Sequence, residues 1–397
     1  MPVEDEIVRV LSRGDGVTAD GRHAPLAAPG DRLMADGTLI PGPNHQRPPC
    51  KHFPVCGGCQ LQHLDEAAWS QFIVDRIAAA LAANGLSAEI RAPLLSPPKT
   101  RRRATLHAER RGRQIHMGFT QAGSHALVDL DECWVLAPEL FALIAPLRGL
   151  LAGLLPNTRR INVHLALTDQ GRDVLIDGLD AEGLAAAEAL TGFARRHKLA
   201  RLAIDEGFGP TARWEPDPVT VTLGGVPVPF PGGSFLQATA EGEAALVASV
   251  YEIAADADTI ADLFAGLGTF TFAFPNARIY AAEGARDPLL SLKAAAGMAQ
   301  RQVFADHRDL FRRPLTPADL NNFNAVVLDP PRAGAKEQAA ELAASSVKLI
   351  AYVSCNPNTF VRDADILCKG GYTLDWIQPV GQFRWSTHVE LAARFSR

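Results

Sequence analysis

Two motifs place reactive side chains at the ends of predicted strands. Asp329 stands in Asp-Pro-Pro-Arg after the apolar run AVVLD, and Cys355 stands in Ser-Cys-Asn-Pro after KLIAYVS. A cysteine at the end of an apolar strand is usually an unreactive core residue. Cys355 differs because it enters a polar turn ahead of a predicted helix, whose N-terminus would lower the pKa of the thiol. We therefore interpret Cys355 as a candidate covalent nucleophile, whereas Cys368, in an amphipathic helical run, is predicted to pack in the core.

A glycine-rich turn indicates a nucleoside site. The strand-like run TIADLF leads to Gly266 and Gly268, and Glu283 ends the next strand-like run. Glycines let the backbone approach a ligand, and a carboxylate at the end of the second strand can accept hydrogen bonds from both ribose hydroxyls. A dinucleotide site would have a third glycine where this sequence has Phe270 and Thr271. The pattern therefore favours S-adenosylmethionine over NAD.

Four cysteines in the first half of the chain have a spacing that predicts a metal site. Cys50, Cys56 and Cys59 form a C-x5-C-x2-C triplet, and Cys133 follows further along the chain. Three cysteines this close together in a glycine-rich loop are unlike scattered core residues. Four thiolates can hold either zinc or a 4Fe-4S cluster, and the spacing by itself leaves both open.

Composition restricts the class of protein. A chain of 397 residues, 47% of them hydrophobic, predicts two large domains and a small third one. Because the formal net charge is -5, RNA binding would require a local basic patch. Residues 91–116 supply such a patch, with eight Lys or Arg against one acid. A pair of strands exposed to solvent would have the same composition.

The ends and the apolar stretches of the sequence bear on its location. The first ten residues carry acids where a secretory signal would carry basic residues, which predicts a cytoplasmic protein. The longest apolar stretch, residues 140–155, is interrupted by Pro146 and Arg148 and is too short to span a membrane. We expect no membrane association.

Alternating strand-like and helical runs in the last third predict an α/β fold with a doubly wound parallel sheet. The strand-like runs are TIADLF, RIYAAE, QVFAD, AVVLD and KLIAYVS, and YTLDWIQPV and VELAARF predict an antiparallel hairpin at the edge of the sheet. The predicted domains are a small β module at 1–45, a mixed α+β central domain at 46–235 with the cysteines and the basic patch, and a catalytic domain at 236–397. Predicted helices before that domain cover residues 66–84, 138–155 and 181–197.

Several longer segments resemble one enzyme family. DLFAGLGTFTFAF, LDPPRAGAKE, AYVSCNPNTFVRDADIL and THVELAARFSR together resemble the RNA uracil-C5 methyltransferases, and the cysteine spacing resembles the ribosomal-RNA branch with an iron–sulfur cluster. The resemblance implies a class I methyltransferase fold, S-adenosylmethionine as methyl donor and a 4Fe-4S cluster on the four cysteines. It also implies a shortened RNA-binding β-barrel at the N-terminus. The expected substrate is RNA, ribosomal rather than transfer RNA, and the expected assembly is a monomer.

The family resemblance also assigns roles to individual residues. It implies that Cys355 adds to carbon 6 of a uridine and that Glu390 removes the proton from carbon 5, while His388 is an alternative base by chemistry alone. The residues that it implies as cofactor contacts, beside Gly266 and Gly268, are Gln237, Phe264, Glu283, Asp309 and Asp329.

Two other functional classes stay open from the sequence. Asp-Pro-Pro also suits methyltransferases that act on an exocyclic amine, which have no need of Cys355. A non-catalytic RNA-binding protein stabilised by a metal site is the other alternative.

Overall fold

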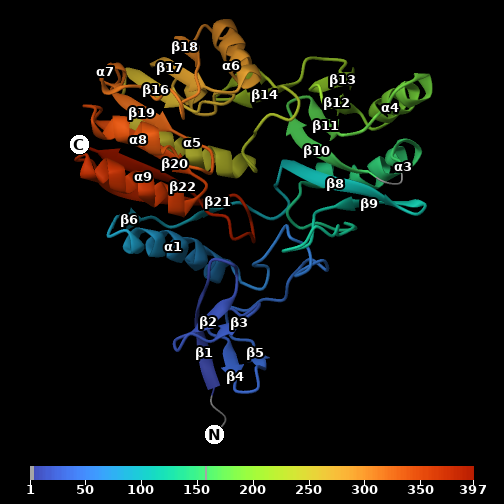
Figure 1. Ribbon diagram of the computed structural model, residues 1–397, viewed down its shortest axis with the longest axis horizontal. Helices are drawn as coiled ribbons and strands as arrows, with labels where there is room; N and C mark the ends of the chain where they lie inside the picture. The colour runs from blue at the N-terminus through green and yellow to red at the C-terminus, as the bar shows by residue number, and fades with distance from the viewer. Residues whose placement is uncertain (1–3, 157–158) are drawn as a thin grey trace.

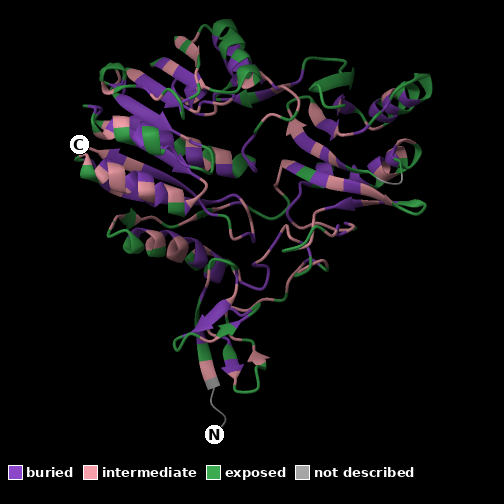
Figure 2. Cartoon of the chain, viewed as in Figure 1, coloured by how far each residue is buried: buried purple, intermediate pink, exposed green. Residues whose placement is uncertain are grey.

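The computed structural model describes residues 4–156 and 159–397, so the first three residues of the predicted N-terminal module lie outside the described chain. Two large lobes, each built on its own sheet, lie side by side, and a small β module extends away from them (Figure 1). Buried residues gather in the sheets and on the inner helix faces, whereas the outer helix faces are exposed (Figure 2). The lobes therefore have separate hydrophobic cores.

The N-terminal module is a five-stranded antiparallel sheet with a small core. Asp31 is fully buried there and accepts hydrogen bonds of 2.7 Å from the backbone N–H groups of Ala28 and Gly42. These bonds tie the following segment to a module whose own core is too small to contribute much stability. In spatial order the strands are β3 (His23–Ala24), β2 (Gly16–Thr18), β1 (Glu4–Val10), β4 (Arg32–Met34) and β5 (Leu39–Ile40).

The central lobe is a six-stranded sheet with short helices packed on it. Its strands are antiparallel except for one parallel pair, β11 and β12, which are connected through α4. The predicted helical stretch 138–155 consists of two helices, α2 (Pro138–Phe141) and α3 (Ile144–Leu154). In spatial order the strands are β13 (Pro210–Trp214), β12 (Leu199–Asp205), β11 (Gly171–Asp177), β10 (Arg160–Thr168), β8 (Arg103–Arg111) and β9 (Gln114–Gly118), and α4 is Leu184–Arg196.

The C-terminal lobe confirms the predicted α/β fold. Five parallel strands are arranged so that the chain winds outward in both directions from β16 and β19, which lie next to each other. Ligands of such sheets bind beyond the carboxyl ends of the strands at this reversal of order. In spatial order the parallel strands are β18 (Val303–His307), β17 (Arg278–Glu283), β16 (Thr259–Leu263), β19 (Ala325–Leu328) and β20 (Leu349–Ser354).

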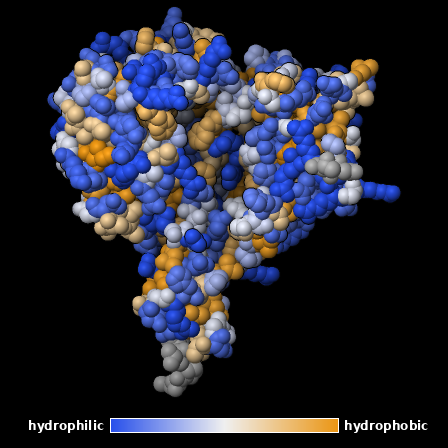
Figure 3. Space-filling view, in the orientation of Figure 1, coloured by the Kyte–Doolittle hydropathy of each residue, from blue (hydrophilic) through white to orange (hydrophobic). Residues whose placement is uncertain are grey.

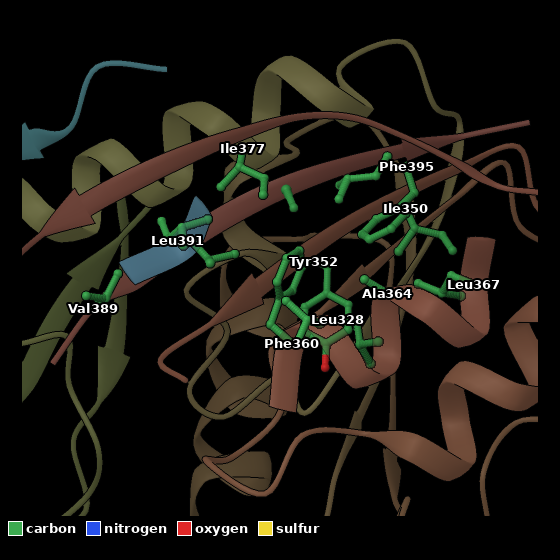
Figure 4. Packing of buried hydrophobic residues seen from close by; sticks show 14 of the residues in the cluster. Leu328, Ile350, Tyr352, Phe360, Ala364, Leu367, Ile377, Val389, Leu391 and Phe395 are labelled. Atoms are coloured by element: carbon green, nitrogen blue, oxygen red, sulfur yellow. The ribbon is translucent and has the colours of Figure 1, made fainter. Parts of the chain in front are cut away.

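Helices cover both faces of this sheet, because its strands are apolar on both sides. One face packs against α1 (Glu66–Ala83), α7 (Pro317–Leu320), α8 (Lys336–Ala343) and α9 (Pro357–Lys369). The other face packs against α5 (Ala240–Ala254), α6 (Arg286–Met298), the 3-10 turn η1 (Thr271–Ala273) and the hairpin of β14 (Thr220–Leu223) and β15 (Val226–Pro229). Figure 4 shows Tyr352, Phe360 and Phe395 meeting in the first of these cores. Each large buried side chain contributes roughly 2 kcal/mol to stability.

The C-terminal hairpin differs from the prediction in one respect. β21 (Thr373–Gly381) and β22 (Glu390–Ser396) are antiparallel as expected, and β22 pairs with β20. The hairpin is not the edge of the sheet, because β6 (Glu89–Ile90) and β7 (Leu94–Leu95) pair with the outer side of β21. The segment from α1 to β7 therefore belongs to the C-terminal lobe, although the sequence assigned it to the central domain. The predicted boundaries at 45 and 235 otherwise stay predictions.

Candidate active site

The adjacent strands β19 and β20 bring Asp329 and Cys355 to the same edge of the sheet. Asp329 directly follows β19 and Cys355 directly follows β20, and the two strands are parallel neighbours. Asn356 is the N-cap of α9, so Cys355 stands one residue before the helix, as the sequence predicted. Both side chains thus lie beyond the carboxyl ends of the strands, where the fold binds ligands.

The electrostatic surroundings of Cys355 correct one expectation from the sequence. A helix N-terminus would lower the pKa of the thiol, but burial raises it to about 11 in this structure. The nearby carboxylates of Glu390 and Asp329 raise the pKa further, and Arg332 opposes them. The thiol is therefore protonated at neutral pH while the site holds no substrate or cofactor.

Glu390, close to the C-terminus, lies near the candidate nucleophile Cys355. It opens β22, which runs antiparallel to β20 with Leu391 opposite Ser354, so that Glu390 lies near Cys355. Its side chain is buried, and burial raises the pKa of its carboxyl to about 7, opposed by a hydrogen bond from Gln382 and by the charge of Arg103. A carboxyl with this pKa can exchange a proton at neutral pH.

His388, the alternative base, lies in a different position. The residue is exposed, and its Nδ1 is 3.3 Å from a guanidinium nitrogen of Arg332. Although the residue as a whole is exposed, its ring is partly buried, and this burial together with the charges of Arg332 and Arg101 lowers its pKa. His388 lines the opening of the site, whereas Glu390 lies inside it.

The turn after β16 has the geometry of a nucleoside site. Glu283 ends β17, and its carboxylate accepts hydrogen bonds from the backbone N–H of Gly266 at 2.8 Å and of Ala285 at 2.6 Å. Phe264 adopts a positive φ of 66°, which a residue with a side chain rarely does. At Gly268, whose φ is 95°, a Cβ would approach the Phe272 ring to 2.7 Å. The turn therefore depends on positive φ angles at Phe264 and Gly268, and on the absence of a side chain at Gly268.

Asp262 is a residue that the sequence reasoning missed as a site residue. It is almost fully buried in β16, and its Oδ2 accepts a hydrogen bond of 2.6 Å from Thr271, while its Oδ1 has no partner in the described residues. Burial raises the pKa of its carboxyl to about 6. An acid inside the apolar run TIADLF was the signal that could have identified it.

The two remaining predicted cofactor contacts differ in their surroundings. Gln237 is buried, and its Oε1 accepts a hydrogen bond of 2.8 Å from Gln382. Asp309 is exposed beyond the end of β18, and its carboxylate accepts a hydrogen bond of 3.0 Å from the backbone N–H of Phe311. Asp309 thus stabilises its own turn, whereas Gln237 belongs to the interior of the site.

A cavity of about 450 Å³ opens over Cys355, between the two large lobes. The space-filling view is hollowed between these lobes (Figure 3). We call this cavity the catalytic pocket; its lining includes Gly57, Gly58, Arg101, Arg103, Phe119, Arg332, Cys355, Phe383 and His388. The cationic and aromatic side chains in this lining are the types that bind phosphates and stack on bases.

The predicted basic patch is not one surface. Arg91 pairs with Glu252 at 2.9 Å, and Arg102 pairs with Glu243 at 2.6 Å, so both stabilise the fold. Arg101 and Arg103 instead enter the catalytic pocket. The Arg103 guanidinium lies 4.6 Å from the centre of the Phe235 ring, and burial lowers its pKa to about 10. These four arginines thus separate into two structural ion pairs and two pocket side chains.

The four upstream cysteines line a second, apolar cavity that we call the cysteine cavity. Its lining includes all four of the predicted ligands together with Phe53, Gly58, Phe119 and Trp134. Burial raises the pKa of Cys50 to about 11 and that of Cys59 to about 12. Within residues 4–156 and 159–397, no three Cys, His, Asp or Glu side chains are arranged to hold a metal ion. The structure therefore gathers the four thiols around one space without bringing them to a single point.

These features define a class I S-adenosylmethionine-dependent methyltransferase. Its fold matches the crystal structure of a Pyrococcus abyssi tRNA (uracil-54, C5)-methyltransferase in complex with S-adenosyl-L-homocysteine, with a TM-score of 0.76, 21% identity and 99% of each chain covered. Residues 228–397 match the family described as tRNA (Uracil-5-)-methyltransferase.

Sequence relatives extend this match along the whole chain. An uncharacterised RNA methyltransferase of Zymomonas mobilis is 48% identical over 99% of both chains. A 23S rRNA (uracil(1939)-C(5))-methyltransferase of Erwinia tasmaniensis is 28% identical, covering 99% of this chain and 89% of that protein. The chain belongs to the uracil-5 family of S-adenosylmethionine-dependent RNA methyltransferases.

The described helices also bear on the membrane expectation. None of the helices in the described ranges combines the length and the apolar character needed to cross a membrane.

Proposed function

We propose that this protein methylates carbon 5 of a uridine in RNA, most specifically in 23S ribosomal RNA, through a covalent bond between Cys355 and carbon 6. The observation that carries the proposal is the arrangement of Cys355 at the end of β20, with Asp329 and Glu390 beside it, beneath a pocket lined by Arg and Phe side chains. A methyltransferase acting on an exocyclic amine would have no use for a thiol at this place.

The chain's own residues account for each step on the base. The Cys355 thiolate adds to carbon 6, which turns the ring into an enolate and makes carbon 5 nucleophilic. Arg103, a buried cation at the same pocket, would stabilise the charge that develops on the ring oxygen. Bound S-adenosylmethionine supplies the methyl group to carbon 5. Glu390 then removes the proton from carbon 5, and Cys355 leaves as the double bond forms again.

The thiol of Cys355 must lose its proton before it can attack. Because burial and two carboxylates raise its pKa, the ligand-free protein keeps Cys355 protonated. The positive sulfonium of bound S-adenosylmethionine would oppose those carboxylates and favour the thiolate. S-adenosylhomocysteine has no such charge, so alkylation of Cys355 should be faster with the first ligand bound than with the second.

The cofactor would lie across the ends of β16, β17 and β19. Glu283 would accept hydrogen bonds from the ribose hydroxyls, and Gly266 and Gly268 would allow close approach of the backbone. The other proposed contacts are Gln237, Phe264, Asp309 and Asp329. Asp329 also acts on Cys355, and burial together with Glu390 raises the pKa of Asp329 well above the ordinary range.

The RNA target would be an unstacked uridine. The catalytic pocket has Phe119 and Phe383 in its lining, which could stack on bases, and Arg101 and Arg332, which could contact phosphates. Extrusion of a base costs a few kcal/mol, least where the base is already unpaired. The substrate we propose is ribosomal rather than transfer RNA, because identity to the 23S rRNA enzyme is 28%, against 21% to the tRNA enzyme of known structure.

We further propose that Cys50, Cys56, Cys59 and Cys133 hold a 4Fe-4S cluster. An all-thiol donor set facing one apolar cavity suits iron–sulfur ligation. A tetrahedral zinc site would draw the sulfurs in to about 2.3 Å from one point. The preference for a cluster over a single ion rests on the resemblance of the C-x5-C-x2-C spacing and the distant Cys133 to the ribosomal-RNA branch of the family. When bound, the cluster would be structural, since it lies across Gly58 and Phe119 from the catalytic pocket.

The experiment that tests the proposal offers the protein RNA in which the target uridine carries fluorine at carbon 5. With S-adenosylmethionine present, the wild type should remain attached to this RNA, because no base can remove fluorine as a proton. Cys355→Ala should give no adduct on a denaturing gel. Parallel assays with 23S rRNA fragments and with transfer RNA identify the substrate, and methylation of transfer RNA alone would contradict the ribosomal assignment.

A further inference from the structure

Gln382 is a buried amide that connects the proposed base to the segment carrying Gln237. It follows β21 directly, and only 2% of its surface is exposed. Its Oε1 accepts a hydrogen bond of 2.9 Å from the backbone N–H of Ala238. Its Nε2 donates to Oε1 of Gln237 at 2.8 Å and to Oε2 of Glu390. One side chain therefore contacts both groups.

The orientation of this amide follows from its partners. The backbone N–H of Ala238 can only donate, so the carbonyl oxygen of Gln382 must face it and the NH2 group must face the other way. Both hydrogens of that NH2 group are then used, one on Gln237 and one on Glu390. Oε1 of Gln237 therefore accepts from Gln382, which fixes the orientation of the Gln237 amide.

Packing leaves Gln382 little room to move. A Cβ on Gly242 would approach the Cβ of Gln382 to 2.5 Å, so glycine is required in the first turn of α5. The N-cap of that helix, Thr239, accepts a hydrogen bond of 3.0 Å from Gly242 and contacts the Ser96 hydroxyl at 2.7 Å. The amide is thus held by neighbours on three separate elements.

We propose that Gln382 is a positioning residue that holds the Glu390 carboxylate in its ionised, correctly turned form for the final proton transfer and aligns Gln237 at the same time. This inference rests on the function proposed above. In that step Glu390 takes the proton from carbon 5. The electron pair of the C–H bond restores the double bond between carbons 5 and 6 and expels Cys355 as a thiolate.

Charge and burial act on Glu390 in opposite directions. Burial raises the pKa of Glu390 to about 7, while the hydrogen bond from Gln382 and the charge of Arg103 lower it. The other ionisable groups around it are Asp329, after β19, and Cys355, after β20. Loss of the Gln382 bond leaves burial less opposed, so the pKa of Glu390 should rise and less carboxylate should be present at neutral pH.

The test compares Gln382→Met with Gln338→Met in the full-length protein. Gln338 is an equally buried amide in α8 whose two hydrogen bonds go to the backbone of Leu315, remote from Glu390. Single-turnover reactions on uridine RNA follow formation and release of the methylated adduct across a pH series. In Gln382→Met, the pH midpoint of release should rise by about one unit, making release roughly fivefold slower near neutral pH. Gln338→Met should keep the wild-type midpoint, and in Gln382→Met adduct formation should change by less than release.

The outcomes separate this inference from the proposed function. If Glu390→Gln releases the adduct slowly but Gln382→Met keeps the wild-type midpoint, Gln382 is only structural and the inference fails. If Glu390→Gln releases the adduct as fast as the wild type, the assignment of the base itself fails. Should Gln382→Met not fold, Gln382→Asn, which keeps an amide but shortens it, carries the same test with the same expected direction.

Discussion

The catalytic pocket and the cysteine cavity share Gly58 and Phe119 as a common wall, but the chemical surroundings of their thiols differ. Burial raises the pKa of the thiol in both, as Cys355 and Cys59 illustrate. Cys355 faces carboxylates, arginines and a cavity of about 450 Å³, whereas Cys59 faces apolar side chains such as Phe53 and Trp134.

The difference teaches that burial alone does not assign a role to a cysteine. A thiol whose surroundings can change charge when ligands bind suits a bond that must form and break. A thiol in a closed apolar cavity suits a bond that persists, because a ligated thiolate there is shielded from water. The predictions below test this division.

The largest effect is expected for the nucleophile. Cys355→Ala should lower methyl transfer by roughly a thousandfold or more, because it removes the one thiol among the residues that line the catalytic pocket in the described chain. Iron content and the denaturation midpoint should stay close to wild type, since the cysteine cavity is intact. Methyl transfer is measured with tritiated cofactor, and appreciable activity in this variant would place the nucleophile elsewhere.

In the cysteine cavity, a substitution should instead remove the metal and lower stability. Cys59→Ser should lose iron and sulfide from anaerobically purified protein and lower the urea midpoint, because the ligand-binding free energy contributes to folding. Cys368→Ser is the matched control, a partly buried cysteine of α9 outside both cavities, and should retain full iron content. Stoichiometric zinc without sulfide in the wild type would refute the cluster but leave a four-cysteine site.

A third prediction concerns the stability contributed by Glu390. Burial raises its pKa from the ordinary 4.5 to about 7, so the folded protein binds this proton more tightly than the unfolded chain does. Its contribution to stability is therefore present at low pH and lost as pH rises through about 7. Glu390→Gln should gain roughly 3 kcal/mol relative to wild type between about pH 4 and pH 8.

Urea denaturation across this range measures the gain. The exposed Glu337→Gln, whose carboxyl stays in water, is the control and should show no comparable trend. A stability difference between Glu390→Gln and wild type that is constant with pH would mean that Glu390 is not buried as described.

The smallest effect is expected for cofactor binding. Glu283→Ala should weaken S-adenosylmethionine binding by about a hundredfold, because two ribose hydroxyls lose a charged acceptor. RNA binding should be nearly unchanged. Calorimetry measures the first and a salt-matched filter assay the second; equal affinity for the cofactor would show that another residue holds the ribose.

Much of the C-terminal lobe could be predicted from local patterns. The alternation of strand-like and helical runs placed β16 to β20 in order, and polar turns after two of them identified Asp329 and Cys355. Helix α1 was predicted within one residue of its observed end, because its helical spacing begins at Glu66 and Gly85 is a local stop signal; the structure adds Asp65 as its N-cap. Such features depend on residues that are neighbours in the sequence, so they can be predicted from it.

The pairing of strands that are far apart in the sequence was harder to predict. The addition of β6 and β7 to β21 joins segments separated by almost the whole chain, and strands of two residues carry no periodic signal. The basic patch looked continuous in the sequence, but Arg102 forms a structural ion pair whereas its neighbours Arg101 and Arg103 enter the catalytic pocket. Which distant segment faces each of these side chains made that separation.

The sequence by itself determined which residues could do chemistry: a cysteine leaving a strand, an acid ending the second strand, and four cysteines with the spacing of ligands. Only the tertiary structure decided their chemical state. It buried Cys355 beside Glu390 and raised both pKa values, and it brought Gln382 to Glu390 across the hairpin. Residue type and spacing are local properties, whereas desolvation and charge proximity depend on which distant segments pack together.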